Sequence, residues 1–287
     1  MDKSFRDLFD ESSTLIEKRA AGGPVESLYF AEELGHPMYQ GLSFGESAEA
    51  EAVVMFLDVR GFTRLSLELE NDELVRILRK LTAASVRAVR QFGGYVGEFT
   101  GDGVMAYFDT GGPAFAALHT ASFLMAGVRD VVNPALKRDG DTGVKVAVGM
   151  EYGKVLWSRV GIGGISQVKP ISEVTFIAGK LSTRKYCEPW HCKVGQQLAV
   201  VIPEEFMSQA AGYPYGDLTY PVFDFDWKQF AQNENYNLVA LKERVLSKVL
   251  SPRARTVAAR ATGAPAVILG REVTPGPPRP PRSRQVG

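Results

Sequence analysis

The sequence is short of cysteine, of net charge and of long apolar runs, and each shortage excludes a class of protein. Its 287 residues include two cysteines, too few for a disulfide framework, so a reducing compartment is the simpler expectation. Its 33 basic and 33 acidic residues cancel, which argues against a dedicated nucleic-acid binder, because such a protein needs surplus positive charge. No uncharged apolar stretch approaches the roughly 18 residues of a membrane span, and the N-terminus lacks the pattern of a signal peptide. We therefore expect a cytoplasmic protein without a membrane span.

The composition divides the chain into three segments. A leader at residues 1–48 carries apolar side chains at helical spacing, which predicts a short amphipathic helix. A domain at 49–248 alternates strand-like and helix-like stretches. A segment at 249–287 is dominated by arginine, proline and glycine, and we expect a disordered basic tail because it has little apolar surface to offset its ordering entropy. The apolar residues of the leader are Phe5, Leu8, Phe9, Leu15 and Ile16.

Hydrophobic patterning within the domain predicts an α+β arrangement with an antiparallel element. An apolar run of strand length ends at Asp58, and two further strands are joined by the turn Thr100-Gly101-Asp102-Gly103. An Asp-Gly pair between β-branched and aromatic residues is a strong signal for a β-hairpin. The expected elements are strands at 53–57, 95–99, 104–108 and 144–157, and helices at 70–91 and 114–133.

Two acidic residues stand at the ends of predicted strands. If the first strand pairs beside the hairpin, the carboxylates of Asp58 and Asp102 meet at one edge of the sheet. Two carboxylates with few other protein ligands suit Mg²⁺ or Mn²⁺, which keep positions open for water and phosphate oxygens. Each residue alone has a simpler explanation, because Asp58 could cap the following helix and Asp102 could serve only the turn.

The residues after Asp58 form a candidate phosphate site. Gly61 permits a sharp turn into the next helix, so the amides of Gly61, Phe62 and Thr63 can point at an anion.

These motifs together resemble the class III adenylate/guanylate cyclase catalytic domain. The resemblance rests on Phe56 to Thr63, on Gly94 to Val96 and on Thr100 to Met105, and it extends less specifically through Val146 to Val155 and Glu173 to Leu181. It covers about residues 52 to 245. It implies a ferredoxin-like α+β fold, with a mixed or antiparallel sheet and flanking helices, that is homodimeric.

The resemblance also implies a reaction and its cofactors. A nucleoside triphosphate would be closed into a 3′,5′-cyclic nucleotide with release of pyrophosphate, assisted by two divalent ions, Mn²⁺ or Mg²⁺. Asp58, Asp102 and the backbone carbonyl of Val59 would hold the ions. The base-reading and transition-state groups would come from the second subunit.

The base-reading and transition-state positions depart from the family pattern. The two base-reading positions fall on Glu98 and Lys169. This pair matches neither the lysine and aspartate of adenylate cyclases nor the glutamate and cysteine of guanylate cyclases. The ribose-orienting asparagine is replaced by Phe176, and the transition-state arginine by Lys180, with Arg184 one helical turn further on. Two interpretations remain open, a degenerate domain that lost turnover and a cyclase for a different base.

A short cyclase without purine-reading residues is similar to the pyrimidine cyclases of the bacterial Pycsar anti-phage systems. That similarity implies cyclic UMP or cyclic CMP as a second messenger for a downstream effector in antiviral defence. The alternatives are an adenylate or guanylate cyclase with an atypical base pocket, and a catalytically silent regulatory nucleotide-binding dimer.

Other motifs are better explained by structure. Cys187, His191 and Cys192 lack a fourth ligand and the spacing of a zinc finger, so we expect packing. His119 falls on a mostly apolar helix and is predicted to be a satisfied structural histidine. The glycines at 161–164 lack the lysine of a P-loop and are predicted to connect two strands.

Overall fold

The structure, a computed structural model, describes residues 4–10, 34–163, 165–183, 185, 187–215 and 218–232. The predicted tail lies outside these residues, as do Leu15, Ile16 and Arg184. The described residues include the whole apolar run that ends at Asp58 and the whole predicted hairpin.

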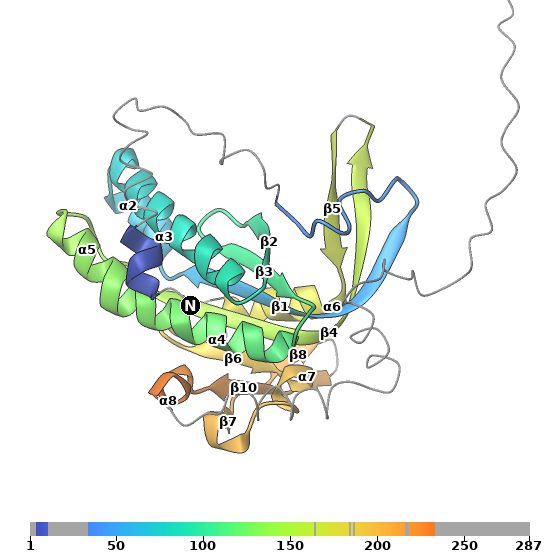
Figure 1. Cartoon of the computed structure of the whole chain (residues 1–287). Coiled ribbons are helices and arrows are strands. Elements are labelled where there is room, and N and C mark those ends of the chain that lie inside the picture. The colour runs from blue at the N-terminus through green and yellow to red at the C-terminus, as the bar shows by residue number, and fades with distance from the viewer. Residues whose placement is uncertain are drawn as a thin grey trace, which may run out of the picture.

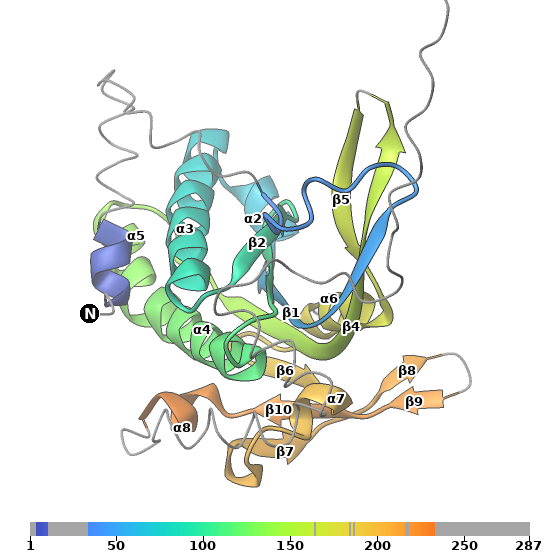
Figure 2. The same cartoon turned by 45° about the vertical axis from the view of Figure 1, so that its right-hand side comes forward.

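An eight-stranded mixed sheet forms the centre of the fold (Figure 1). Seven strands follow the order β2-β3-β1-β4-β6-β10-β7, and β5 pairs with β4 to form a long hairpin that projects from the sheet (Figure 2). Only the β4–β6 pairing is parallel among the described strands. The strands are β1 (Ser47–Val59), β2 (Tyr95–Phe99), β3 (Val104–Phe108), β4 (Val146–Ile162), β5 (Ile165–Ile171), β6 (Cys192–Gly195), β7 (Met207–Gln209) and β10 (Val222–Phe225), with β8 (Tyr213–Tyr215) and β9 (Leu218–Tyr220) paired separately.

Helices cover both faces of this sheet. Helices α3 and α4 lie together on one face, and α6 packs against β1 and β4 on the other. The predicted α+β class with flanking helices is therefore confirmed. The helices are α2 (Phe62–Glu68), α3 (Asn71–Gln91), α4 (Pro113–Gly127), α5 (Asn133–Arg138), α6 (Glu173–Ser182), α7 (Gln196–Ala199) and α8 (Trp227–Gln232).

The two predicted hairpin strands are confirmed at their predicted ends, whereas the second long helix differs from its prediction. A π-helical turn at Val128–Val132 separates α4 from α5, and the helical stretch runs on to Arg138. Pro134 lies in the first turn of α5 and has no N–H to donate, so the regular hydrogen-bond pattern is interrupted there.

The stretch Pro113–Arg138 is also long and apolar enough to cross a membrane by composition. However, 67% of its most apolar window is buried inside the fold. This is the environment of a core helix, and it explains why α4 is apolar all round.

The leader contributes a helical segment at residues 5–10. Its Phe5, Leu8 and Phe9 are buried, and the ring of Phe5 lies 5.2 Å from that of Phe123 on α4. Close packing of this segment depends on Gly127, where a Cβ would collide with the Phe5 ring.

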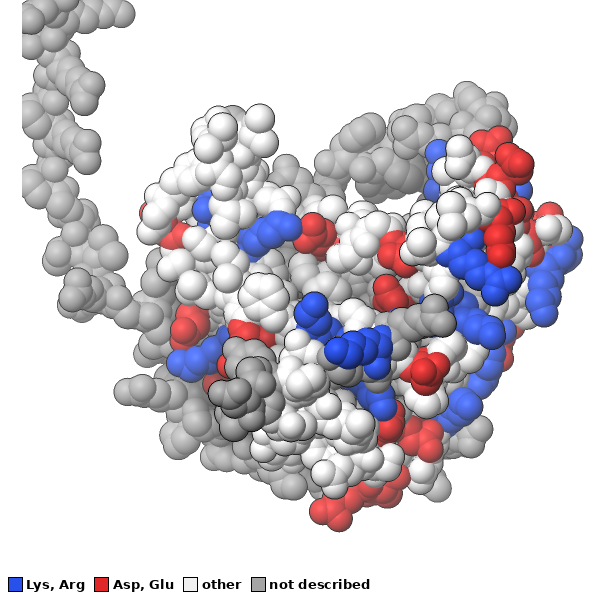
Figure 3. Space-filling view, turned by 180° about the vertical axis from the view of Figure 1, so that it is seen from behind, with Lys and Arg blue, Asp and Glu red and all other residues white. Residues whose placement is uncertain are grey.

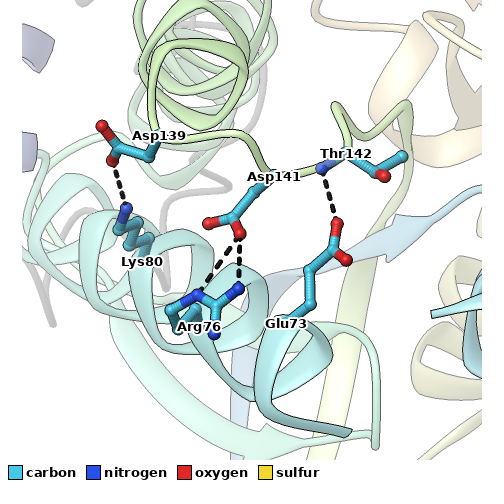
Figure 4. A network of polar contacts seen from close by, with 6 residues as sticks. All are labelled: Glu73, Arg76, Lys80, Asp139, Asp141 and Thr142. Carbon is cyan, nitrogen blue, oxygen red and sulfur yellow. Dashed lines mark hydrogen bonds and ion pairs between the residues drawn. The ribbon is translucent and has the colours of Figure 1, made fainter. Parts of the chain in front are cut away.

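Ion pairs join α3 to the loop after α5 (Figure 4). Arg76 donates to Asp141 at 2.7 Å, Lys80 donates to Asp139 at 2.7 Å, and Glu73 accepts from the Thr142 amide. On the face seen in Figure 3, basic and acidic side chains are interspersed, in keeping with the zero net charge.

Candidate functional site

Asp58 and Asp102 come together because β1 and β3 are neighbours. The antiparallel register places Leu57 opposite Val104, so the end of β1 lies beside the turn that carries Asp102. In this turn the Thr100 amide donates to the Gly103 carbonyl at 3.0 Å. Gly103 is required for the approach, since a Cβ there would collide with the Leu57 carbonyl oxygen.

Burial raises the pKa of both carboxyl groups, and the Asp102 charge raises that of Asp58 further. Burial raises the pKa of Asp58 to about 6; Arg60 opposes the rise and the Asp102 charge adds to it. Burial also raises the pKa of Asp102, against the opposing effects of its own backbone amide and of Arg60. Two carboxylates that repel each other in a partly dehydrated position favour an added cation, which would stabilise both charges.

Arg60 is already paired with one of these carboxylates. Its Nη1 lies 2.9 Å from Oδ2 of Asp58 in an ion pair, and the two side chains are 5% and 31% exposed. The backbone amide of Arg60 donates to the Lys145 carbonyl at 2.7 Å and so fixes the chain where it leaves β1. The ion pair occupies one oxygen of Asp58.

The capping explanation for Asp58 is wrong. The N-cap of α2 is Gly61, in the left-handed region with φ 73°, and no side chain caps this helix. A left-handed residue at this position suits glycine. Gly61 and Thr63 are exposed and Phe62 is partly exposed.

The donor set fits Mg²⁺ or Mn²⁺ better than zinc. Within the described ranges, no group of three or more histidine, cysteine, aspartate or glutamate side chains is arranged to hold a metal. Two carboxylates, completed by phosphate oxygens and water, are what Mg²⁺ commonly uses. Cys187 and Cys192 are free and buried, and burial raises the pKa of both thiols, as expected for packing residues.

Glu98 and Lys169 form a second ion pair. The Lys169 ammonium donates to both carboxylate oxygens of Glu98 at 2.9 Å. Glu98 lies on β2 and Lys169 on β5, where it pairs with Ser158 of β4. Two residues that are 71 positions apart in sequence therefore meet in one protomer, with their side chains 41% and 34% exposed.

A β-bulge at Gly97 turns Glu98 toward this partner. Val96 pairs with Ala106 and Glu98 with Met105, so that Gly97 is the extra residue on β2. Side chains alternate between faces along a strand, and one inserted residue reverses the alternation. Glu98 consequently shares a face with Tyr95 and not with the buried Val96.

Helix α6 carries the remaining predicted residues that the structure describes. Ser172 caps it by accepting from the Thr175 amide. Phe176 is 68% exposed, and Lys180, one turn later on the same helix, is also exposed. Neither is buried within the protomer, so both are available to a second molecule.

The sequence reasoning missed Arg60 and Gly97 as contributors to the site. Arg60 had a usable signal, since it is a basic residue directly after a buried strand and two positions from Asp58. The bulge at Gly97 had only a weak sequence signal, namely a glycine inside a strand pattern. For His119, the ring packs 4.1 Å from that of Phe115, but its Nε2 lacks a partner among the described residues, so it is not fully satisfied.

Part of the chain that carries this geometry matches a known family model. Residues 46–166 match the family model described as the adenylate and guanylate cyclase catalytic domain. This range includes β1, the β2–β3 hairpin and β4, and therefore Asp58, Asp102 and Glu98.

Curated relatives whose names give different nucleotide substrates are similar to about half of the chain. A cytidylate cyclase of Escherichia coli is 27% identical over 159 residues, covering 51% of this chain and 34% of the relative. An adenylate cyclase of Anabaena cylindrica is 26% identical, with 51% and 30% covered. A uridylate cyclase of Rhodovulum sp. (strain MB263) is 28% identical, with 47% and 59% covered. The chain thus spans about a third of the length of the first two.

Solved structures show the same fold. The guanylyl cyclase Cya2 superposes with a TM-score of 0.58 at 17% identity, covering 63% of this chain and 94% of that one.

Proposed function

We propose that this chain, whose residues 46–166 belong to the class III adenylate and guanylate cyclase family, is an active pyrimidine cyclase. It would convert CTP or UTP into the 3′,5′-cyclic nucleotide and pyrophosphate. The observation that carries the proposal is the pair of carboxylates, Asp58 and Asp102, held where the end of β1 lies beside the β2–β3 turn, with raised pKa values. A domain that had lost turnover has no need to retain both.

The proposed reaction is an intramolecular displacement at the α-phosphorus. The ribose 3′-oxygen bonds to this phosphorus, the bond to the bridging oxygen of the β-phosphate breaks, and the 3′-hydroxyl proton passes to solvent. Two divalent ions, Mn²⁺ or Mg²⁺, would lower the pKa of the 3′-hydroxyl and neutralise the leaving pyrophosphate. Asp58, Asp102 and the Val59 carbonyl would hold these ions.

The other residues bind and orient the substrate. The amides of Gly61, Phe62 and Thr63 receive phosphate oxygens, and Lys180 or Arg184 stabilises charge on the transferred phosphorus. Because Phe176 and Lys180 are exposed, we assign them to a site completed by the second copy of a homodimer.

Glu98 and Lys169 read the base in this proposal. A carboxylate can accept from the exocyclic amine of cytosine, and an ammonium can donate to a pyrimidine carbonyl. Relatives named cytidylate and uridylate cyclase support this preference. The product would serve as a cytoplasmic second messenger in anti-phage defence and act on a separate effector.

Removal of one metal-binding carboxylate tests the proposal. Asp58→Asn and Asp102→Asn should each lower Mn²⁺-dependent pyrophosphate release at least about a hundredfold, because each removes a charge that the transition state needs. The matched control is Asp139→Asn, which removes an aspartate paired with Lys80 on the helical layer and should leave the rate unchanged. A double Asp58→Asn/Asp102→Asn variant that still produces a cyclic nucleotide would refute the assignment of these two residues as metal ligands.

A further inference from the structure

Residues 34–46, which we call the N-terminal strap, run across the sheet face opposite α3 and α4. At one end the Gly35 amide donates to the Val96 carbonyl of β2 at 2.8 Å. At the other end Arg159 of β4 donates through Nη2 to the Gln40 carbonyl at 2.6 Å and through Nε to that of Leu42. Both ribbon views show this segment passing beside the β4–β5 hairpin (Figures 1 and 2).

His36 anchors the strap in the face of the sheet. The residue is 3% exposed, and its Nε2 lies 2.9 Å from Oδ2 of Asp109, directly after β3. Its Nδ1 accepts from the Met38 amide at 3.1 Å, whereas its Nε2 contacts the carboxylate as an ion-pair neighbour without hydrogen-bond geometry. The imidazole ring centroid lies 4.0 Å from that of Tyr95 on β2.

Aromatic packing extends the anchor to β4. Tyr39 of the strap stacks on Trp157 with ring centroids 4.4 Å apart and planes 22° from parallel. Trp157 is 1% exposed. The strap therefore contacts three strands, β2 through Tyr95 and Val96, the end of β3 through Asp109, and β4 through Trp157 and Arg159.

These contacts flank both members of the Glu98–Lys169 pair. Val96 precedes Glu98 across the Gly97 bulge, and Arg159 is adjacent to Ser158, the residue that pairs with Lys169. The pair itself is partly exposed, and an exposed ion pair contributes too little stability to hold two strands in place. The positions of Glu98 and Lys169 are therefore set by the strands that carry them and by whatever joins those strands.

We infer that the strap is a brace that fixes the Glu98–Lys169 pair, with His36 and Arg159 as positioning residues that set which base the site accepts. The selectivity part rests on the proposed function, and the bracing part does not. Discrimination between bases depends on polar groups that stay unsatisfied when the wrong base binds, and this requires groups that cannot move to meet it. A brace supplies that rigidity.

Two strap variants test the bracing by hydrogen exchange, with no need for activity. Arg159→Met keeps the aliphatic stem and removes the donors to Gln40 and Leu42, and His36→Phe keeps an aromatic ring and removes the link to Asp109. Each should speed amide exchange in β2 (95–99) and β5 (165–171) about tenfold or more while β6 (192–195) is unchanged. His36→Gln retains a donor for Asp109 and should restore slow exchange.

The control is Arg76→Met, which removes an arginine–aspartate pair on the helical layer and should alter neither strand (Figure 4). Unchanged exchange in both β2 and β5 of the strap variants would overturn the bracing.

Base selectivity tests the second part of the inference. In Arg159→Met and His36→Phe, the ratio of kcat/KM for the preferred triphosphate to that for the next best should fall about tenfold, with kcat for the preferred substrate within about threefold of the unmodified protein. Selectivity that stays unchanged while β2 and β5 exchange faster would overturn the positioning role and leave the proposed function intact. If the unmodified protein makes no cyclic product, the proposed function and the selectivity part of the inference are both overturned. The bracing part is then decided by the hydrogen-exchange measurements alone.

Discussion

Arg60 shows how a single residue can prepare a charged site. Its guanidinium is buried beside Asp58, and within the described part of the chain Nε and Nη2 have no acceptor. Burial of hydrogen-bond donors without acceptors lowers the stability of the fold, so the presence of a buried arginine here needs a compensating contribution to function. Orientation of the Asp58 carboxylate is such a contribution, because a ligand held by a neighbouring ion pair loses less freedom when it binds an ion.

We predict that Arg60→Met lowers the affinity of the protein for Mn²⁺ about 10–100-fold, the usual cost of losing a group that orients a metal ligand. Arg60→Lys should recover most of the affinity, since only Nη1 contacts the carboxylate. Mn²⁺ titration followed by electron paramagnetic resonance measures this without turnover. Unchanged or tighter binding in Arg60→Met would refute the orienting role.

Glu98 and Lys169 are expected to control the base and not the metal. Glu98→Gln removes the charge at constant shape, and Lys169→Met removes the ammonium that it pairs with. Each should change the order of preference among CTP, UTP, ATP and GTP and leave the Mn²⁺ concentration for half-maximal rate within about twofold, because neither residue contacts Asp58 in the assignment above. A product profile identical to that of the unmodified protein would show that these residues do not read the base.

At the scale of elements, α4 contains a histidine in an apolar environment. His119 lies among aromatic rings, with Phe115 at 4.1 Å and Phe230 of α8 at 4.8 Å, and burial lowers its pKa to about 4. The folded protein therefore holds the neutral form, whereas the unfolded chain binds a proton near pH 6.5. Stability must fall as the pH drops from about 6.5 towards 4, since over this window the unfolded state binds more protons.

We predict that His119→Phe removes about 1–3 kcal/mol of this pH dependence. The free energy of unfolding, measured by urea denaturation at pH 7.5 and pH 5, should differ less between the two pH values in the variant. An equal difference in both proteins would mean that His119 titrates normally in the fold.

Local elements were predictable from sequence where their signals are local. The Asp-Gly turn and the alternation around it predicted the β2–β3 hairpin with its correct ends. The run before Asp58 predicted a strand at 53–57, which is the inner part of β1; the strand itself begins six residues earlier and ends two residues later. The bulge at Gly97 was not predictable, because it depends on which residues of β3 face β2. Likewise the Glu98–Lys169 contact follows from the register of β4 with β5, which no local pattern encodes.

Buried polar contacts between distant segments were equally inaccessible from sequence. Glu151 was seen only as part of a strand motif, but the residue is 1% exposed and its carboxylate accepts hydrogen bonds from the Leu198 amide and the Tyr220 hydroxyl. His36 and Asp109 also form a contact, although they are 73 positions apart in the sequence. Only the tertiary fold brings such pairs together.

At the scale of the whole molecule, the account requires two copies of the chain. The metal-binding carboxylates and the α6 residues are assigned to opposite subunits of each site, so two differently inactivated variants should complement one another. Asp58→Asn and a Lys180→Ala/Arg184→Ala double variant should each be inactive alone. An equimolar mixture with free subunit exchange should recover about a quarter of the unmodified activity, because half of the dimers are mixed and each has one intact site of two.

Analytical ultracentrifugation of the mixture supplies the control that subunits have formed dimers. Dimers that form but never recover activity would contradict a site shared between subunits.

If the chain cyclises a pyrimidine nucleotide, a single incubation will show it. The purified protein is mixed with Mn²⁺ and each of CTP, UTP, ATP and GTP, and the products are identified by mass spectrometry. The account predicts cyclic CMP or cyclic UMP as the dominant product, absent when Asp58→Asn replaces the unmodified protein. Dominant cyclic AMP or cyclic GMP, or no cyclic product from any of the four, would contradict it.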